Sequence, residues 1–142
     1  MILYHGSNIE IDAIDLDKCR PCKDFGKGFY TSPVLEQAWI MAKRTVRIHK
    51  KGSPCVTALI NNRNRKFRDI QSPDCNTDNK YDIVIGPVAN DDIAALIDVF
   101  LAGLISDDAL AKELAFRDLS AQVSFHTEKS IAGLRKKEAY HG

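Results

Sequence analysis

The chain has 142 residues, of which 44% are hydrophobic and 27% are charged, and its formal net charge is +1. This length predicts one domain that buries a core without disulfides or metals to hold it. The balanced charge argues against non-specific binding to nucleic acid, and the apolar content argues against disorder. Residues 1–7 do not resemble a signal peptide and no apolar run approaches membrane-spanning length, so we expect a soluble cytoplasmic protein.

The chain begins with a short apolar strand, Ile2-Leu3-Tyr4, followed by His5-Gly6-Ser7-Asn8. A histidine at a strand end, beside a glycine and a small hydroxyl residue, stands where side chains meet a ligand. Taken alone, it is explained better by a hydrogen bond within a turn. Residues 9–14 alternate apolar and polar side chains, which predicts another strand or an extended arm, and residues 15–23 are expected to form a loop.

Residues 23–32, KDFGKGFYTS, predict a loop, a short strand and the start of a helix. Gly26 and Gly28 allow positive φ and let the backbone pass close to a ligand, where a Cβ would collide. Phe29-Tyr30-Thr31 has the aromatic and β-branched composition of a strand. Tyr30 would then offer a flat ring and a hydroxyl to an aromatic ligand.

The next helix is predicted to begin at Ser32-Pro33, an N-cap and first-turn pair. One side has the spacing of a core-facing stripe. The stripe is formed by Leu35, Ala38, Trp39, Ala42 and Val46. Basic residues gather towards its far end, between positions 43 and 51. The negative helix C-terminus explains them as a solvated face better than a nucleic-acid patch would.

The middle of the chain predicts two strands and two helices. The strands are expected at residues 55–60 and 81–87, the second closed by a Gly-Pro pair. The helices are expected after Asn90 and after Ser106, each with acidic residues in its first turn. Residues 67–79 contain proline, asparagine and aspartate and predict an exposed loop.

Residues 121–134, AQVSFHTEKSIAGL, predict a strand that leads into a closing helix. Because side chains alternate along a strand, Val123 and Phe125 point to one face of the sheet. The opposite face is shared by Gln122, Ser124 and His126.

In the closing helix, Thr127 is predicted as the N-cap and Glu128 as a first-turn acid, with Ile131 and Leu134 directed inward. The charged tail from Arg135 onward is expected to fray.

The four cysteines do not form a recognisable metal motif. Cys19 and Cys22 have the spacing of half a zinc site, but Cys55 and Cys75 are far apart and have no neighbouring histidine. We interpret all four as reduced thiols and predict no metal site.

Three separated motifs carry a family resemblance: YHGS at residues 4–7, GKGFYTS at residues 26–32, and a late strand that opens with Gln122 and leads into a helix. In this order they resemble the diphtheria-toxin and poly(ADP-ribose)-polymerase branch of the ADP-ribosyltransferase superfamily. The phrases LYHGS, KDFGKGFYTS, YDIVIGPVAND and QVSFHTEKSI look like DUF3990, a small bacterial family described as a domain of unknown function and placed near those transferases. The resemblance covers most of the chain.

The resemblance implies a single α+β domain over residues 1–142, folded as an ADP-ribosyltransferase-like split β-sandwich with flanking helices. It implies an NAD-dependent mono-ADP-ribosyltransferase that uses NAD as co-substrate, cleaves its nicotinamide–ribose bond and requires no metal. The acceptor is left open between a protein, a nucleic acid and a small molecule. Small transferases of this kind often act as toxins held by a neighbouring antitoxin, which suggests a protein partner by analogy.

The resemblance also assigns roles to residues. His5 matches the histidine that bonds the ribose next to nicotinamide, Gly6 the residue whose backbone holds the nicotinamide amide, and Ser7 the small residue that assists. Tyr30 matches the tyrosine that stacks on nicotinamide. The other expected NAD-binding positions lie in the glycine loop and just beyond it: Phe25, Gly26, Lys27, Gly28 and Ser32.

The chain departs from this branch at the start of the last strand, where relatives carry a catalytic glutamate. Aligning strand on strand places Gln122 there, with Glu128 as the second choice. A glutamine amide can bond the ribose hydroxyl, but it opposes developing positive charge more weakly than a carboxylate. Three outcomes stay open: Gln122 supports slow transfer, Glu128 swings in, or the fold is a weak or inactive NAD- or nucleotide-binding module that acts through a protein partner.

Overall fold

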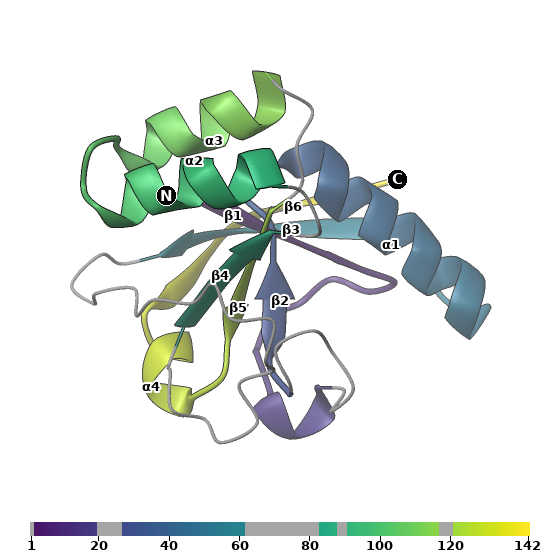
Figure 1. The fold of residues 1–142 in the computed structure, drawn as a ribbon. Coiled ribbons are helices and arrows are strands. Elements are labelled where there is room, and N and C mark those ends of the chain that lie inside the picture. Colours follow the sequence, from purple (N-terminus) through teal and green to yellow (C-terminus); the bar gives the residue numbers. More distant parts are fainter. Residues whose placement is uncertain (1, 20–26, 62–82, 88–90, 117–120) are drawn as a thin grey trace.

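A computed structural model describes residues 2–19, 27–61, 83–87, 91–116 and 121–142. It is a mixed α+β structure with two small antiparallel sheets and four α-helices in the described residues, which confirms the predicted fold class at this level (Figure 1). The elements in chain order are β1 (Ile2–Ser7), the 3-10 helix η1 (Leu16–Lys18), β2 (Phe29–Thr31), α1 (Leu35–His49), β3 (Cys55–Asn61), β4 (Ile83–Pro87), α2 (Asp91–Leu101), α3 (Asp107–Phe116), β5 (Ala121–Phe125), α4 (Glu128–Ile131) and β6 (Leu134–His141).

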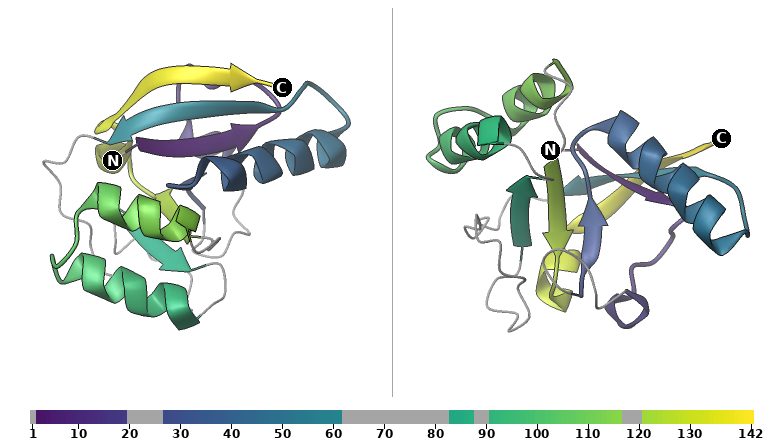
Figure 2. Two further views of the ribbon diagram at one scale, coloured as in Figure 1. Left: turned by 90° about the horizontal axis from the view of Figure 1, so that it is seen from above. Right: turned by 45° about the vertical axis from the view of Figure 1, so that its right-hand side comes forward.

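The strands form two separate three-stranded sheets. Sheet A has the order β1-β3-β6 and sheet B the order β2-β5-β4, and every neighbouring pair is antiparallel. The sheets meet at one isolated bridge, where Tyr4 and Ser32 exchange two backbone hydrogen bonds of 2.8 Å each. This bridge brings the first strand of the chain beside the strand that follows the glycine loop (Figures 1 and 2).

The main core lies where the two sheets meet α2 and α3. α2 packs against β4 and α3, so these helices cover sheet B on one side (Figure 2). Fully burying one large apolar side chain stabilises the fold by about 1.5–3 kcal/mol, so this cluster is the main source of stability. Its buried members are Leu3, Phe29, Val34, Leu59, Ile83, Ile85, Ile97, Phe100, Leu110, Leu114, Val123 and Phe125.

A second, smaller cluster lies between α1 and the other face of sheet A. Ala38 and Ala42 are buried against Val56, while Trp39 and Leu35 are partly buried at its margin. This confirms the inward side of the predicted stripe. Its small residues let the helix approach the sheet closely.

The start of α1 differs from the prediction. The N-cap is Val34, and the helix begins at Leu35 rather than at Ser32-Pro33. Ser32 is extended because its backbone pairs with Tyr4, and its hydroxyl accepts a hydrogen bond from the Val34 N–H at 3.1 Å. The serine therefore orders the turn before the helix and does not cap it.

The charged tail is not frayed, contrary to the prediction. Residues 134–141 form β6, which pairs with β3 along its length and has one register shift between Ala58 and Leu59. Pairing with β3 satisfies backbone groups that a frayed tail would leave to water. α4 is correspondingly shorter than predicted, and Leu134 begins the strand instead of ending the helix.

The remaining strands and α-helices agree with the sequence prediction except at their ends, whereas the 3-10 helix η1 lies inside the loop predicted for residues 15–23. β1 continues through Ser7, and residues 9–14 form no regular strand but lie along sheet A as an arm, with the Ile11 N–H bonded to Thr57 Oγ1 at 3.3 Å. The expected loop at 67–79 and the expected cap at Asn90 lie outside the described residues. Within the described ranges, no helix combines the length and apolar character needed to cross a bilayer.

Candidate functional site

The first two sequence motifs meet at the seam between the sheets, which we define as the region around His5, Tyr30 and His126. His5 Nδ1 lies 2.7 Å from the backbone carbonyl oxygen of Tyr30. Since a carbonyl oxygen can only accept, Nδ1 carries the proton and donates it to this bond. The imidazole also stacks on Phe29, with ring centroids 4.2 Å apart and planes 25° apart. Both contacts fix the orientation of the imidazole.

The third motif reaches the same seam through β5. Tyr30 pairs in register with Ser124, so the two side chains share a face of sheet B. The Tyr30 ring meets the edge of the His126 ring, with centroids 6.1 Å apart and planes at 81°. Tyr30 is only partly buried, whereas its neighbours Phe29 and Thr31 are buried on the core side. The predicted stacking residue is therefore not part of the core.

His126 also lies at this seam, although the sequence analysis predicted no functional role for it. Its Nδ1 lies 2.8 Å from the Lys27 carbonyl oxygen and its Nε2 lies 2.8 Å from Ser124 Oγ. Burial lowers the pKa of His126, although the bond to Lys27 acts in the opposite direction, so the ring is neutral at pH 7. Nδ1 must then donate to the Lys27 carbonyl, and Nε2 accepts from the Ser124 hydroxyl.

Two glycines of the predicted site are explained by close packing. A Cβ at Gly28 would lie 2.7 Å from His126 Nδ1, and one at Gly6 would lie 2.0 Å from the Ala38 carbonyl oxygen. Neither glycine has positive φ; among the described glycines only Gly52 and Gly103 do. Gly28 therefore does not use the positive φ that a glycine allows, and its close approach is to His126 of the same chain.

The two candidates for the glutamate position lie on different elements. Gln122 is part of β5, two residues from Ser124 and so on the Tyr30 face, and is partly buried. Glu128 is the exposed first residue of α4, beneath a capping box formed by Thr127 and Ser130. Its predicted role as a first-turn acid is confirmed, whereas Gln122 lies on the sheet face that carries Tyr30.

The other predicted binding residues are only partly at the seam. The Ser7 hydroxyl bonds Asn8 Oδ1 at 3.3 Å, and the Ser32 hydroxyl is held by Val34. Lys27 reaches the seam through its backbone carbonyl, while its side chain is exposed. Phe25 and Gly26 lie outside the described residues.

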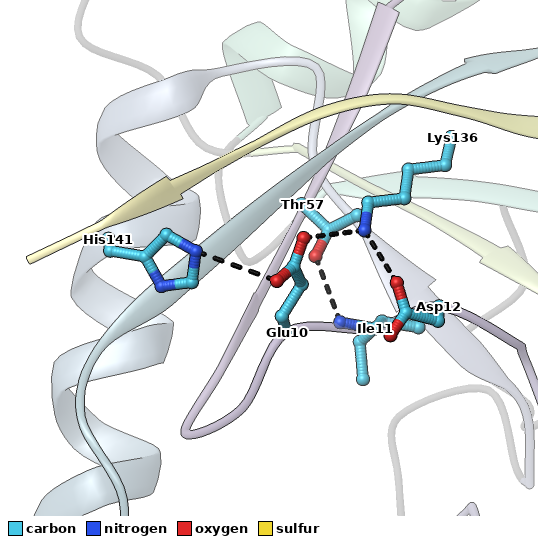
Figure 3. A network of polar contacts seen from close by, with 6 residues as sticks. All are labelled: Glu10, Ile11, Asp12, Thr57, Lys136 and His141. Carbon is cyan, nitrogen blue, oxygen red and sulfur yellow. Dashed lines mark hydrogen bonds and ion pairs between the residues drawn. The ribbon is translucent and has the colours of Figure 1, made fainter.

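A separate polar network lies on sheet A. The Lys136 ammonium contacts Glu10 at 2.6 Å and Asp12 at 2.7 Å, and His141 Nε2 lies 3.6 Å from Glu10 (Figure 3). A hollow of about 110 Å³ adjoins this network; it is much too small for a dinucleotide and does not include His5, Tyr30 or Gln122. Its lining residues are Ile11, Asp12, Ile14, Leu59, Ile131, Leu134 and Lys136. We assign a structural role to this network, because it ties the 9–14 arm to β6.

Metal ligands do not cluster in the described part of the chain, where no group of three or more His, Cys, Asp or Glu residues could hold an ion. Cys19 and Cys55 are free thiols, while Cys22 and Cys75 fall in ranges that the structure does not describe.

Comparison with known proteins identifies one family. A family model with the description "Protein of unknown function (DUF3990)" matches residues 1–72 and 56–135, which together span most of the chain. No curated protein and no solved structure matches the sequence.

Proposed function

We propose that this chain, which belongs to the DUF3990 family, is an NAD-dependent mono-ADP-ribosyltransferase. The reaction breaks the bond between nicotinamide and ribose in NAD and joins ADP-ribose to an acceptor nucleophile. The observation that carries the proposal is the meeting of three distant motifs. The His5 imidazole lies 2.7 Å from the Tyr30 carbonyl, and the Tyr30 ring contacts His126 of the segment that follows β5. In this proposal the two sheets correspond to the split β-sandwich of those transferases.

In the proposed mechanism, His5 bonds a hydroxyl of the ribose next to nicotinamide and Tyr30 stacks on the nicotinamide ring. The bond from His5 Nδ1 to the Tyr30 carbonyl sets the imidazole before NAD binds, so little ordering remains to be done on binding. His126 bonds the Lys27 carbonyl, and the edge of its ring restricts the position of the Tyr30 ring. Preorganisation of this kind is how a site favours one substrate geometry.

Gln122 is the weak point of the proposed chemistry. As nicotinamide leaves, positive charge develops on the ribose, and a carboxylate would stabilise it better than the neutral amide of Gln122. Loss of one preorganised group of this kind costs roughly 3–4 kcal/mol of transition-state stabilisation. The proposed enzyme is therefore slow, and Gln122→Glu is expected to raise its rate of nicotinamide release.

Nicotinamide release from NAD, followed by chromatography, tests the proposal. We expect release from the wild type and its loss in His5→Ala and Tyr30→Ala, with the exposed histidine variant His49→Ala as the matched control. Gln122→Ala should lower release more than Glu128→Ala. If Glu128→Ala abolishes release while Gln122→Ala does not, the assignment of the catalytic position to Gln122 is wrong.

A second candidate function rests on Gln122 itself. A fold of this type without its glutamate can bind NAD or another nucleotide, cleave nothing and act through a protein partner. Calorimetry with NAD separates the two candidates, because binding that is lost in Tyr30→Ala but accompanied by no nicotinamide release supports the binding module. Release without a labelled product would instead indicate hydrolysis with water as the acceptor.

A toxin role, in which a neighbouring antitoxin holds the protein in check in the cytoplasm, is part of the same proposal. Growth arrest on expression that is relieved by His5→Ala would support it. Growth arrest that persists in His5→Ala would show that toxicity does not depend on the seam.

A further inference from the structure

The outer side of α1 carries an unusual combination of exposed apolar and cationic side chains. Ile40, Met41 and Ile48 are exposed by 57%, 39% and 54% of their surface. Single exposed apolar residues are ordinary, but three on one helix face form a patch. We call this surface the outer patch of α1, and its members are Ile40, Met41, Lys43, Arg44, Arg47 and Ile48.

The spacing of these residues makes a ridge. Ile40, Arg44 and Ile48 follow one another at four-residue intervals, so they form one row along the helix. Rows with this spacing are the ones that interdigitate when two helices pack against each other. The opposite side of α1 already packs on sheet A through Ala38 and Ala42. The ridge therefore faces away from the sheet.

The cations of the patch are not neutralised within the described chain. Lys43, Arg44 and Arg47 make no ion pair with any described carboxylate. Residues 43–51 contain five lysines and arginines and no acid, while the whole chain has a net charge of only +1. Positive charge is thus concentrated towards the C-terminal end of α1, and carboxylates on a partner would complement it.

We propose that the outer patch of α1 is the docking surface for an acidic amphipathic helix of a partner protein. Carboxylates of that helix meet Arg44 and Arg47, and its apolar side chains pack against Ile40 and Ile48. Figure 1 shows α1 running away from α2 and α3 to the margin of the molecule, where a second helix can lie along it. This proposal does not depend on the activity of the seam.

Other occupants fit the patch less well. A nucleic acid would neutralise the cations but would leave exposed isoleucines against a phosphate backbone, since its affinity comes mainly from charge. A membrane surface requires a wide apolar helix face, and in α1 that face is already buried on sheet A. The alternation of Ile40, Arg44 and Ile48 instead matches the mixed apolar and charged surfaces of helix-to-helix recognition.

A peptide selection against the full chain tests the proposal. Random peptides long enough to form helices are displayed and selected on the wild type after depletion on the Arg44→Glu/Ile48→Ser double variant. We expect the enriched peptides to carry Asp or Glu and Leu, Ile or Met at helical spacing. The affinity of a representative peptide should fall by about tenfold or more in each of the single variants Arg44→Glu and Ile48→Ser.

The matched controls are Lys112→Glu and Val99→Ser, exposed positions on α3 and α2. They should leave peptide affinity unchanged, and only the Arg44→Glu effect should shrink at high salt. Enrichment of peptides without the acidic and apolar pattern, or failure to enrich any, would overturn the proposal. So would tighter binding of duplex DNA or of phosphatidylglycerol vesicles than of every selected peptide.

Discussion

The seam can be compared with the polar network of Glu10, Asp12, Lys136 and His141 on sheet A, which we call the edge network. Both are built from polar side chains, but they are held in different ways. At the seam, His5 and His126 each bond a backbone carbonyl, and Ser124 is fully buried. At the edge, Lys136 and Asp12 form an ion pair in contact with solvent (Figure 3). Backbone carbonyls fix a side chain at a known position, whereas exposed ion pairs are screened by water and salt. The comparison indicates that the seam is preorganised and that the edge is adaptable.

The largest effect is expected where the seam meets α1. A Cβ at Gly6 would lie 2.0 Å from the Ala38 carbonyl oxygen, so Gly6→Ala must push the helix from the sheet. We expect a loss of about 3 kcal/mol in the free energy of unfolding, measured in urea. Gly103→Ala is the control, because that glycine has positive φ but nothing near its missing Cβ. A smaller loss for Gly6→Ala than for Gly103→Ala would contradict the close packing.

The next effect concerns the buried bond at His126. Ser124→Ala removes the hydroxyl that donates to His126 Nε2 and leaves this nitrogen buried without that donor. The expected loss is about 1–2 kcal/mol in the free energy of unfolding. Thr45→Ala removes an exposed hydroxyl that bonds within α1, and it should cost little. Equal losses for the two variants would show that the seam bond is no stronger than a surface one.

A smaller effect is expected from pH. Burial lowers the pKa of His126 below its ordinary value of 6.5, so the unfolded chain binds the proton more readily than the folded one. The stabilisation from neutral His126 is complete above pH 6.5 and decreases as the pH falls towards the lowered pKa. Thermal unfolding between pH 5 and 8 should show a weaker acid dependence for His126→Gln than for the wild type. Parallel profiles would contradict a buried neutral imidazole.

The smallest effect is expected at the edge network. Lys136→Ala removes two ion pairs that are exposed to water, and we expect a barely measurable change in the urea midpoint. At high salt the urea midpoints of Lys136→Ala and the wild type should be equal. A destabilisation as large as that of Ser124→Ala would show that the edge holds the arm more firmly than its exposure indicates.

The helices and strands with strong periodicity could be predicted from sequence. The spacing of Ala38 and Ala42 placed the inward side of α1 correctly, and the alternation of Val123 and Phe125 gave the face of β5. β6 was missed because its charged residues resemble a solvated tail. Among the described strands it is an edge strand paired with β3, and edge strands tolerate charge.

The seam could be predicted only in part. Its residues His5 and Tyr30 were assigned to a site from a family resemblance, as was Gln122 on β5, and not from any spacing rule. The bond between His126 and the Lys27 carbonyl joins residues 99 positions apart, and no local pattern encodes such a contact. The alternation of Gln122, Ser124 and His126 was the available signal, because it placed a histidine on the polar face of a strand.

The bridge between Tyr4 and Ser32 has a mechanical consequence. In the described residues the two sheets are joined by this pair of backbone hydrogen bonds and by the bond from His5 Nδ1 to the Tyr30 carbonyl, so each sheet can keep its own ladder while these few bonds open. A ligand that enters between β1 and β2 would thus have to break a few hydrogen bonds and not the ladder of a continuous sheet. Hydrogen exchange of the Tyr4 and Ser32 amides would measure how often these bonds open.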